Sequence, residues 1–136
     1  MSTVTETPAR SGRSLVRRGL LAVLLSVLST AGLLAVARAV RIAPGFEPLT
    51  WPSVISFTVI GAVGAVVVYW LLARLSDSPE RTFTIVAAVV LVLSYIPDFV
   101  LLSEDENATI LGVAALLLMH TAVAAVCVAV LTRRTG

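Results

Sequence analysis

Four long apolar runs dominate the sequence, at residues 19–40, 54–72, 83–102 and 108–131. Every charged residue except Arg38 and Asp98 lies outside these runs. A helix needs about 20 residues to cross a bilayer core of about 30 Å. Because backbone groups in lipid must form their hydrogen bonds within the chain, the pattern predicts four transmembrane helices.

Three short links join the predicted helices, and such links favour antiparallel neighbours. The second link carries Ser78 and Pro79, which suit the N-cap and the first position of the third helix. The predicted fold class is therefore all-α, a four-helix transmembrane bundle over residues 19–132 with antiparallel, up-down-up-down helices. Residues 1–18 are polar and rich in Arg, Ser and Thr, and they are predicted to form a disordered cytoplasmic tail.

The composition excludes most soluble folds. Of 136 residues, 58% are hydrophobic and 13% are charged, and the mean hydropathy is +1.01. All ten basic residues are Arg and most lie near helix ends, so we interpret them as topology signals rather than as a nucleic-acid surface. The single cysteine, Cys127, excludes an internal disulfide. The predicted partner is the lipid bilayer and not nucleic acid.

The arginines are distributed unevenly between the two ends of the predicted bundle. With the N-terminus inside, only Arg38 and Arg41 lie outside, and the other eight are cytoplasmic. Since cytoplasmic segments carry the excess of basic residues, both termini are predicted to be cytoplasmic, in the cell membrane of a prokaryote. Trp51 and Trp70 lie near opposite ends of the second run, as interfacial aromatic residues do.

A cleaved signal peptide within residues 1–39 is an alternative interpretation of the first run. Arg17 and Arg18 precede the apolar stretch, and the small residues around Arg38 resemble a cleavage site. The apolar stretch is longer than the usual hydrophobic region of a signal peptide. The other three helices keep the same orientation in both interpretations.

His120 lies near the middle of the fourth run, roughly 18 Å from its start at the helical rise. Ionisable groups at such depth are costly and usually face the interior of a bundle. The imidazole either binds a proton or a metal ion, or it is neutral and hydrogen-bonded to a neighbouring helix. A lone His is a poor metal ligand, and no metal or cofactor is predicted.

Asp98 lies about 6 Å from the end of the third run, on a polar stripe with Ser94 that should face the bundle. The preceding residue, Pro97, predicts a kink. Asp98 either forms a cation or proton site or is a solvated or paired interfacial carboxylate. Arg38 is a candidate partner for it; alternatively, Arg38 reaches the outer headgroups, or the first helix frays before it.

Small residues in two of the runs predict close helix packing. They are Gly61, Gly64 and Ala65 in the second run and Thr121 and Ala125 in the fourth. The same positions could equally mediate self-association. A homo-oligomer or a membrane-protein partner is therefore also expected.

A set of short motifs runs through the chain: Pro48-Leu49-Thr50-Trp51-Pro52, Gly61 with Gly64, Arg81-Thr82-Phe83, Leu93-Ser94-Tyr95-Ile96-Pro97-Asp98 and Met119-His120. Together they resemble a family of small four-helix membrane proteins of unknown function, found mainly in actinobacteria and haloarchaea. The resemblance spans roughly residues 20–132. It implies the same architecture and draws attention to Asp98 and His120, but it implies no activity.

The expected function is that of a multi-pass membrane protein with a structural, accessory or partner-binding role. No enzyme is predicted, because the sequence has no catalytic motif and no nucleophile and base at matched depth. The alternative is a small transporter, or a proton- or cation-coupled protein, that uses His120 and Asp98. The helical rise separates these two residues in depth by roughly 12 Å, so a water-filled path would have to connect them.

Overall fold

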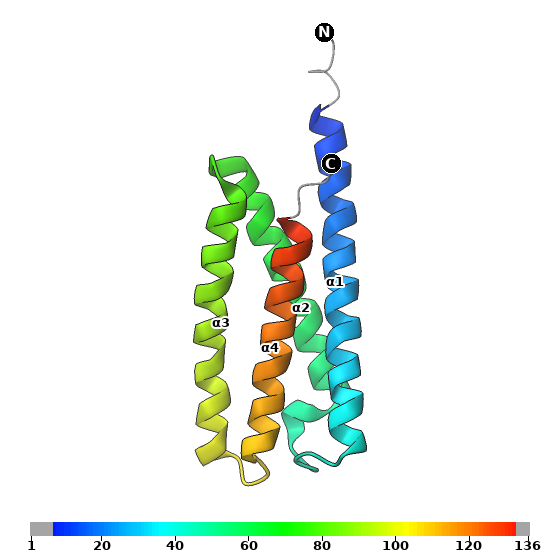
Figure 1. Ribbon diagram of the computed structural model, residues 1–136, viewed down its shortest axis with the longest axis vertical. Coiled ribbons are helices and arrows are strands. Elements are labelled where there is room, and N and C mark those ends of the chain that lie inside the picture. The colour runs from blue at the N-terminus through cyan, green and yellow to red at the C-terminus, as the bar shows by residue number, and fades with distance from the viewer. Residues whose placement is uncertain (1–6, 133–136) are drawn as a thin grey trace.

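A computed structural model describes residues 7–132, with side chains from Ser14 onward. The described part of the chain is almost entirely helical (Figure 1). Each of its four long helices is long and apolar enough to cross a membrane. In chain order the elements are α1 (Thr7–Ala39), the short 3-10 helix η2 (Glu47–Leu49), α2 (Trp51–Leu75), α3 (Pro79–Glu104) and α4 (Ile110–Leu131).

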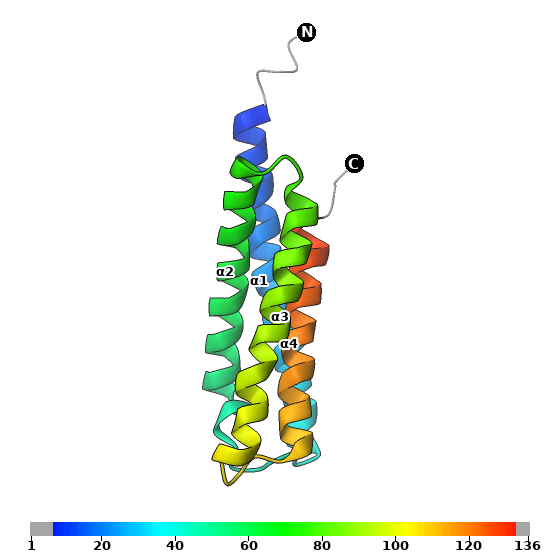
Figure 2. The same cartoon turned by 90° about the vertical axis from the view of Figure 1, so that its left-hand side faces the viewer.

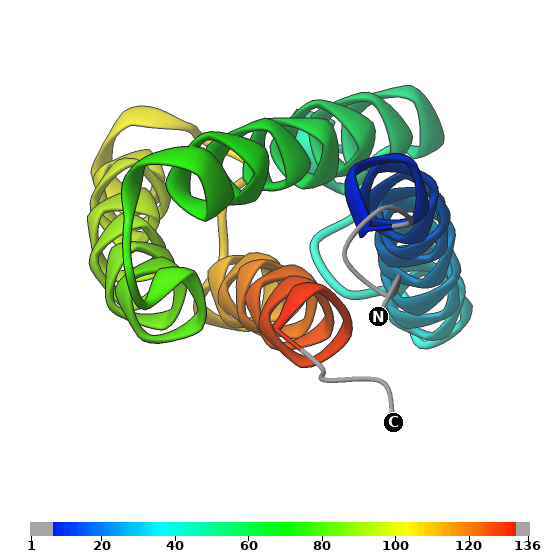
Figure 3. The same cartoon turned by 90° about the horizontal axis from the view of Figure 1, so that it is seen from above.

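The long helices form an antiparallel bundle, which confirms the predicted all-α fold class (Figures 1 and 2). We call the end where α1 begins and α4 ends the terminal end, and the opposite end the distal end. α1 packs against α2 and α4, while α3 packs against α4 and less extensively against α2. α2 runs obliquely, so that its terminal end lies beside α3 and its distal end lies beside α1 (Figures 1 and 3).

The helices differ from the apolar runs mainly at their ends. α1 begins at Thr7 rather than Gly19, so residues 7–18 of the expected disordered tail are helical, while the remainder of that tail lies outside the described residues. α2 and α3 also extend past their runs, since polar residues at a helix end still complete backbone hydrogen bonds. α4 begins later, at Ile110, because the Thr109 side chain accepts a hydrogen bond from the Gly112 N–H at 2.9 Å.

The start of α3 agrees with the predicted positions, with Ser78 as the N-cap and Pro79 next. The Ser78 side chain makes no capping hydrogen bond; its backbone N–H instead donates to Ser76 Oγ at 3.2 Å. Further along, α3 continues through Pro97 as a single helix.

A tightly turned link between α1 and η2 closes the distal end. Arg41 and Ala43 have φ values of 58° and 48°, in the left-handed region that non-glycine residues rarely adopt. The turn buries Ala43 and Phe46 against the start of α4. A Cβ added to Gly112 there would lie 2.7 Å from Ala43 Cβ, so only glycine allows this close approach.

Two apolar clusters fill the interior of the bundle. The distal cluster consists of Leu34, Ala43, Phe46, Leu49, Val54, Val113, Leu116 and Met119. The terminal cluster consists of Ala22, Ala62, Tyr69, Phe83, Cys127 and Leu131.

Candidate functional site

Asp98 of α3 and His120 of α4 meet in the interior of the bundle. Asp98 Oδ2 lies 2.7 Å from His120 Nδ1, and 9% and 39% of the two side chains, respectively, are exposed. Among the described residues, neither of these two atoms has another hydrogen-bonding partner. The predicted separation of roughly 12 Å in depth, obtained from the helical rise, is therefore wrong.

Two features of the helices bring the side chains together. Counted from the ends at Glu104 and Ile110, the two residues differ in depth by only about 6 Å at the helical rise. In addition, the Cα–Cβ bonds of a helix tilt toward its N-terminus. Because α3 and α4 are antiparallel, Asp98 tilts toward the terminal end and His120 toward the distal end, so each side chain reaches toward the other.

Asp98 and His120 belong to a polar layer with three further residues, Ser26, Thr30 and Thr58. The layer includes every Ser, Thr and Asp side chain that is buried among the described residues, together with the half-buried His120. Along α2, for example, Thr58 lies between Val54 of the distal cluster and Ala62 of the terminal cluster. All four long helices therefore contribute to a polar layer that separates the two apolar clusters.

On the α1–α2 side of this layer, hydroxyl groups donate hydrogen bonds to one another and to the backbone of α1. Thr58 Oγ1 donates to Thr30 Oγ1 at 2.9 Å, and Thr30 Oγ1 donates in turn to the Ser26 carbonyl at 3.1 Å. Ser26 Oγ lies 3.8 Å from Cys127 Sγ on α4. This chain of contacts joins three helices without using an ionisable carboxylate or imidazole.

His120 lies on the inward stripe of α4, seven residues from both Val113 and Cys127, which are buried. Since Nδ1 faces Asp98, Nε2 is the ring atom left for other contacts. In a neutral ring it accepts a hydrogen bond, and in a protonated ring it donates one. The pair can therefore hold α3 to α4, and its chemistry also allows it to take up or release a proton.

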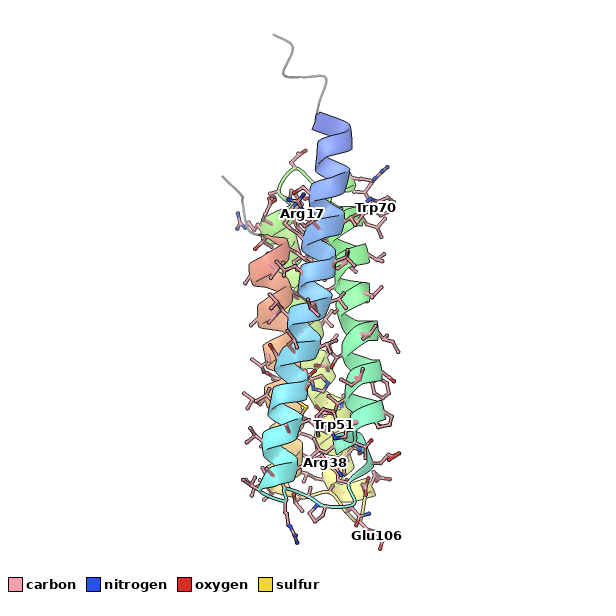
Figure 4. All side chains as sticks on the ribbon, turned by 90° about the vertical axis from the view of Figure 1, so that its right-hand side faces the viewer. Arg17, Arg38, Trp51, Trp70 and Glu106 are labelled. Carbon is pink, nitrogen blue, oxygen red and sulfur yellow. The ribbon has the colours of Figure 1, made fainter. Side chains whose placement is uncertain are left out.

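Arg38 is not the partner of Asp98. Its Nη1 donates to the Leu49 carbonyl at 3.2 Å, and α1 does not fray before it but continues to Ala39. Arg38 lies at the distal end of the bundle (Figure 4), while Asp98 is buried. The guanidinium thus ties the end of α1 to the link that precedes α2.

A second polar contact joins α3 to α4. The hydroxyls of Tyr95 and Thr121 lie 2.6 Å apart, so Thr121, predicted as a packing residue, contacts α3 through a hydrogen bond although it is exposed. Ser94 instead donates to the Leu91 carbonyl of its own helix at 2.7 Å.

The small residues that were predicted to pack against other helices do not all lie at helix contacts. Gly61 and Gly64 are exposed, and a Cβ added to either would meet no atom within 4 Å, so they do not pack against another helix of this chain. Ala65 packs against the terminal cluster, whereas Ala125 is exposed. The inward face of α2 is the stripe of Val54, Thr58, Ala62 and Tyr69.

α1 approaches α2 closely at Gly19, which was not among the predicted packing residues. A Cβ added there would lie 2.9 Å from Val66 Cγ1. Thr30 and Thr58 were also missed as interior residues. The available signal was spacing, because Thr58 follows Val54 and precedes Ala62 by four residues, which places all three on one helix face.

One family model matches residues 10–136, which is nearly the whole chain. The chain belongs to DUF6069, a family of unknown function. No curated protein and no solved structure matches it. Because the function of the DUF6069 family is unknown, membership in it assigns no activity to this chain.

The polar layer of this DUF6069 member offers few metal ligands. Within the part of the chain that the structure describes, no group of three or more His, Cys, Asp or Glu side chains could hold a metal ion. Asp98 and His120 would supply two ligands, and a structural zinc site needs four. The expectation that no metal binds stays a prediction.

Proposed function

We propose that this DUF6069 member is a non-enzymatic accessory protein of the cell membrane that binds a membrane partner. The observation that carries the proposal is the contact between Asp98 and His120, which commits the ionisable pair of the polar layer to joining two helices. A hydrolase or transferase site would need a nucleophile and a base in contact with each other. Among the described residues, His120 Nδ1 contacts the Asp98 carboxylate, and no hydroxyl or thiol is hydrogen-bonded to the imidazole.

The exposed surface of α3 supports the partner-binding part of the proposal. Among its residues only Phe83 and Asp98 are buried. Large apolar side chains cover much of the rest of the helix, and lipid or another membrane protein must cover them in turn. Those with about half or more of their surface exposed are Ile85, Val89, Val90, Val92, Leu93, Ile96, Phe99 and Val100.

The proposed orientation places the terminal end in the cytoplasm. Arg17 lies at the terminal end and Glu106 at the distal end (Figure 4). Basic residues near membrane spans are enriched on the cytoplasmic side. Reporter fusions at both chain ends test this proposal, which expects a cytoplasmic signal from each.

Reconstitution tests the proposed role of the pair. His120→Ala and Asp98→Ala should lower the yield of folded protein in detergent, because each leaves one member of the pair without its partner in the bilayer interior. Proton and cation flux in vesicles should not change. Thr84→Val is the matched control, since Thr84 is exposed and donates only to the Glu80 carbonyl of its own helix.

A proton- or cation-coupled role is the second candidate. It is favoured by the polar layer, in which all four helices place polar side chains between two apolar clusters. Ionisable groups inside a membrane bundle are typical of ion and proton pathways. If wild-type vesicles carry a flux that either variant abolishes while the protein stays folded, this second candidate replaces the accessory role.

A further inference from the structure

In the described part of the chain, the side-chain hydrogen bonds and the ring contact that join α2 and its C-cap to α3 lie near the terminal end of the bundle. The Tyr69 hydroxyl donates to Glu80 Oε2 at 2.9 Å, and the Tyr69 and Phe83 rings meet edge to face with centroids 5.4 Å apart. Ser76 Oγ and Thr82 Oγ1 lie 3.3 Å apart. Because Tyr69 and Phe83 are both buried, this end of α3 is anchored firmly.

The faces of α2 and α3 that meet near the terminal end are exposed farther toward the distal end. Gly61 lies seven residues before Val68, which is packed in the terminal cluster, yet Gly61 is exposed and has no neighbour. Leu93 lies eleven residues after Thr82, on the same side of α3, and is 56% exposed. The oblique course of α2 away from α3 agrees with this change (Figures 1 and 3).

The distal half of α3 buries little apolar surface and makes two polar contacts with α4. Asp98 is its single buried residue, and Leu101 is only partly buried against the distal cluster. The other contact is the hydrogen bond between Tyr95 and Thr121. Interhelical hydrogen bonds in a bilayer are weak on average, so contacts of this kind can break without unfolding the protein.

We infer that α3 is a hinged element. It pivots about the anchor formed by Tyr69, Glu80 and Phe83, and the contact between Asp98 and His120 is the latch that holds its distal half against α4. Release of the latch moves the distal half of α3 outward and uncovers the polar layer on the α2–α3 side. This inference rests on the proposed role of the pair as the contact that holds α3.

Spin-label distance measurements in nanodiscs test the hinge on the full chain, with the buried native thiol removed by Cys127→Ser. One doubly labelled protein reports the distal end through Ser56→Cys and Ser103→Cys. A second reports the terminal end through Ala73→Cys and Arg81→Cys. All four labelled positions are exposed, so the labels do not disturb the interior.

Asp98→Ala should raise the population of longer distal distances by about threefold to twentyfold, the range expected for losing one interhelical hydrogen bond in a membrane. The terminal distances should not change. Tyr95→Phe is the second latch variant and should act in the same direction if Asp98→Ala folds poorly. Tyr69→Phe is the reverse control and should broaden the terminal distances.

Two results would overturn the hinge, and they differ in what they mean for the pair. Equal broadening at both ends in Asp98→Ala and Tyr95→Phe would contradict the hinge but keep the pair as a structural contact. Unchanged distances at both ends in both latch variants would contradict the hinge and also the proposed role of the pair in holding α3.

Discussion

Asp98 Oδ2 and His120 Nδ1 lie 2.7 Å apart although the two residues start from different depths in the bundle. The opposite tilt of side chains on antiparallel helices brings them together. Either residue alone would be an isolated ionisable group inside the membrane, which is costly. Together they form the contact on which the proposed functions depend, and they lie in one layer with the hydroxyls of Thr30 and Thr58.

Thr58→Val should destabilise the bundle modestly. The substitution removes the hydroxyl that donates to Thr30 Oγ1 and keeps the shape of the side chain. Interhelical hydrogen bonds in membranes contribute about 0.6 kcal/mol on average and at most about 1.7 kcal/mol. Unfolding in mixed micelles measures the loss, and Thr84→Val provides the zero reference. Equal stabilities of the two variants would show that the hydroxyl pair contributes nothing.

Gly19→Leu should be more damaging than Gly32→Leu, although both glycines lie on α1. A Cβ at Gly19 would meet Val66 Cγ1 at 2.9 Å, whereas a Cβ at Gly32 would meet no atom within 4 Å. Overpacking of this kind costs about 1–3 kcal/mol. Thermal denaturation in detergent compares the two proteins. If Gly32→Leu proved the more damaging, the close approach of α1 to α2 would be misplaced.

Thr109→Ala should weaken the start of α4. The Thr109 hydroxyl accepts from the Gly112 N–H, and loss of such an N-cap costs about 1 kcal/mol. Thr109→Ser keeps the acceptor and should retain most of the stability. Hydrogen exchange of the first turn of α4 gives the readout, and the prediction fails if alanine and serine protect this turn equally.

Arg38→Gln and Asp98→Asn should have additive effects on the free energy of unfolding. Arg38 donates to the Leu49 carbonyl, and Asp98 faces His120 on another side of the bundle, so the two share no partner. Independent sites add within about 0.3–0.5 kcal/mol. A larger coupling energy would revive the pairing of Arg38 with Asp98 that the sequence had suggested.

The architecture could be predicted from the sequence because each helix is a long apolar run, and lipid leaves such a run no alternative to a helix. Helix ends were harder, since α1 continues into polar residues as far back as Thr7. The interior faces were harder still. All four runs are apolar on every side, so hydrophobicity does not show which side of α2 carries Thr58 inward and Gly61 outward.

Asp98 and His120 were each singled out from the sequence, but the contact between them was not predicted. Asp98 and His120 stood out because ionisable groups are rare in membrane helices. Their contact was missed because depth was counted along each run, without the true helix ends or the direction of the side chains. Arg38 was one candidate partner for Asp98, with reach to the headgroups or fraying of the first helix as the alternatives, while in the structure it contacts the Leu49 carbonyl of a link whose turn the sequence did not reveal.

A double-mutant cycle on Asp98→Ala and His120→Ala tests the central contact most directly. Free energies of unfolding would be measured for the wild type, both single variants and the double variant in one bilayer-like medium. Residues in contact show coupling energies of about 0.5–3 kcal/mol, and a value in this range is predicted for the pair. A coupling energy of zero, with all four proteins folded, would contradict the conclusion that this contact joins α3 to α4.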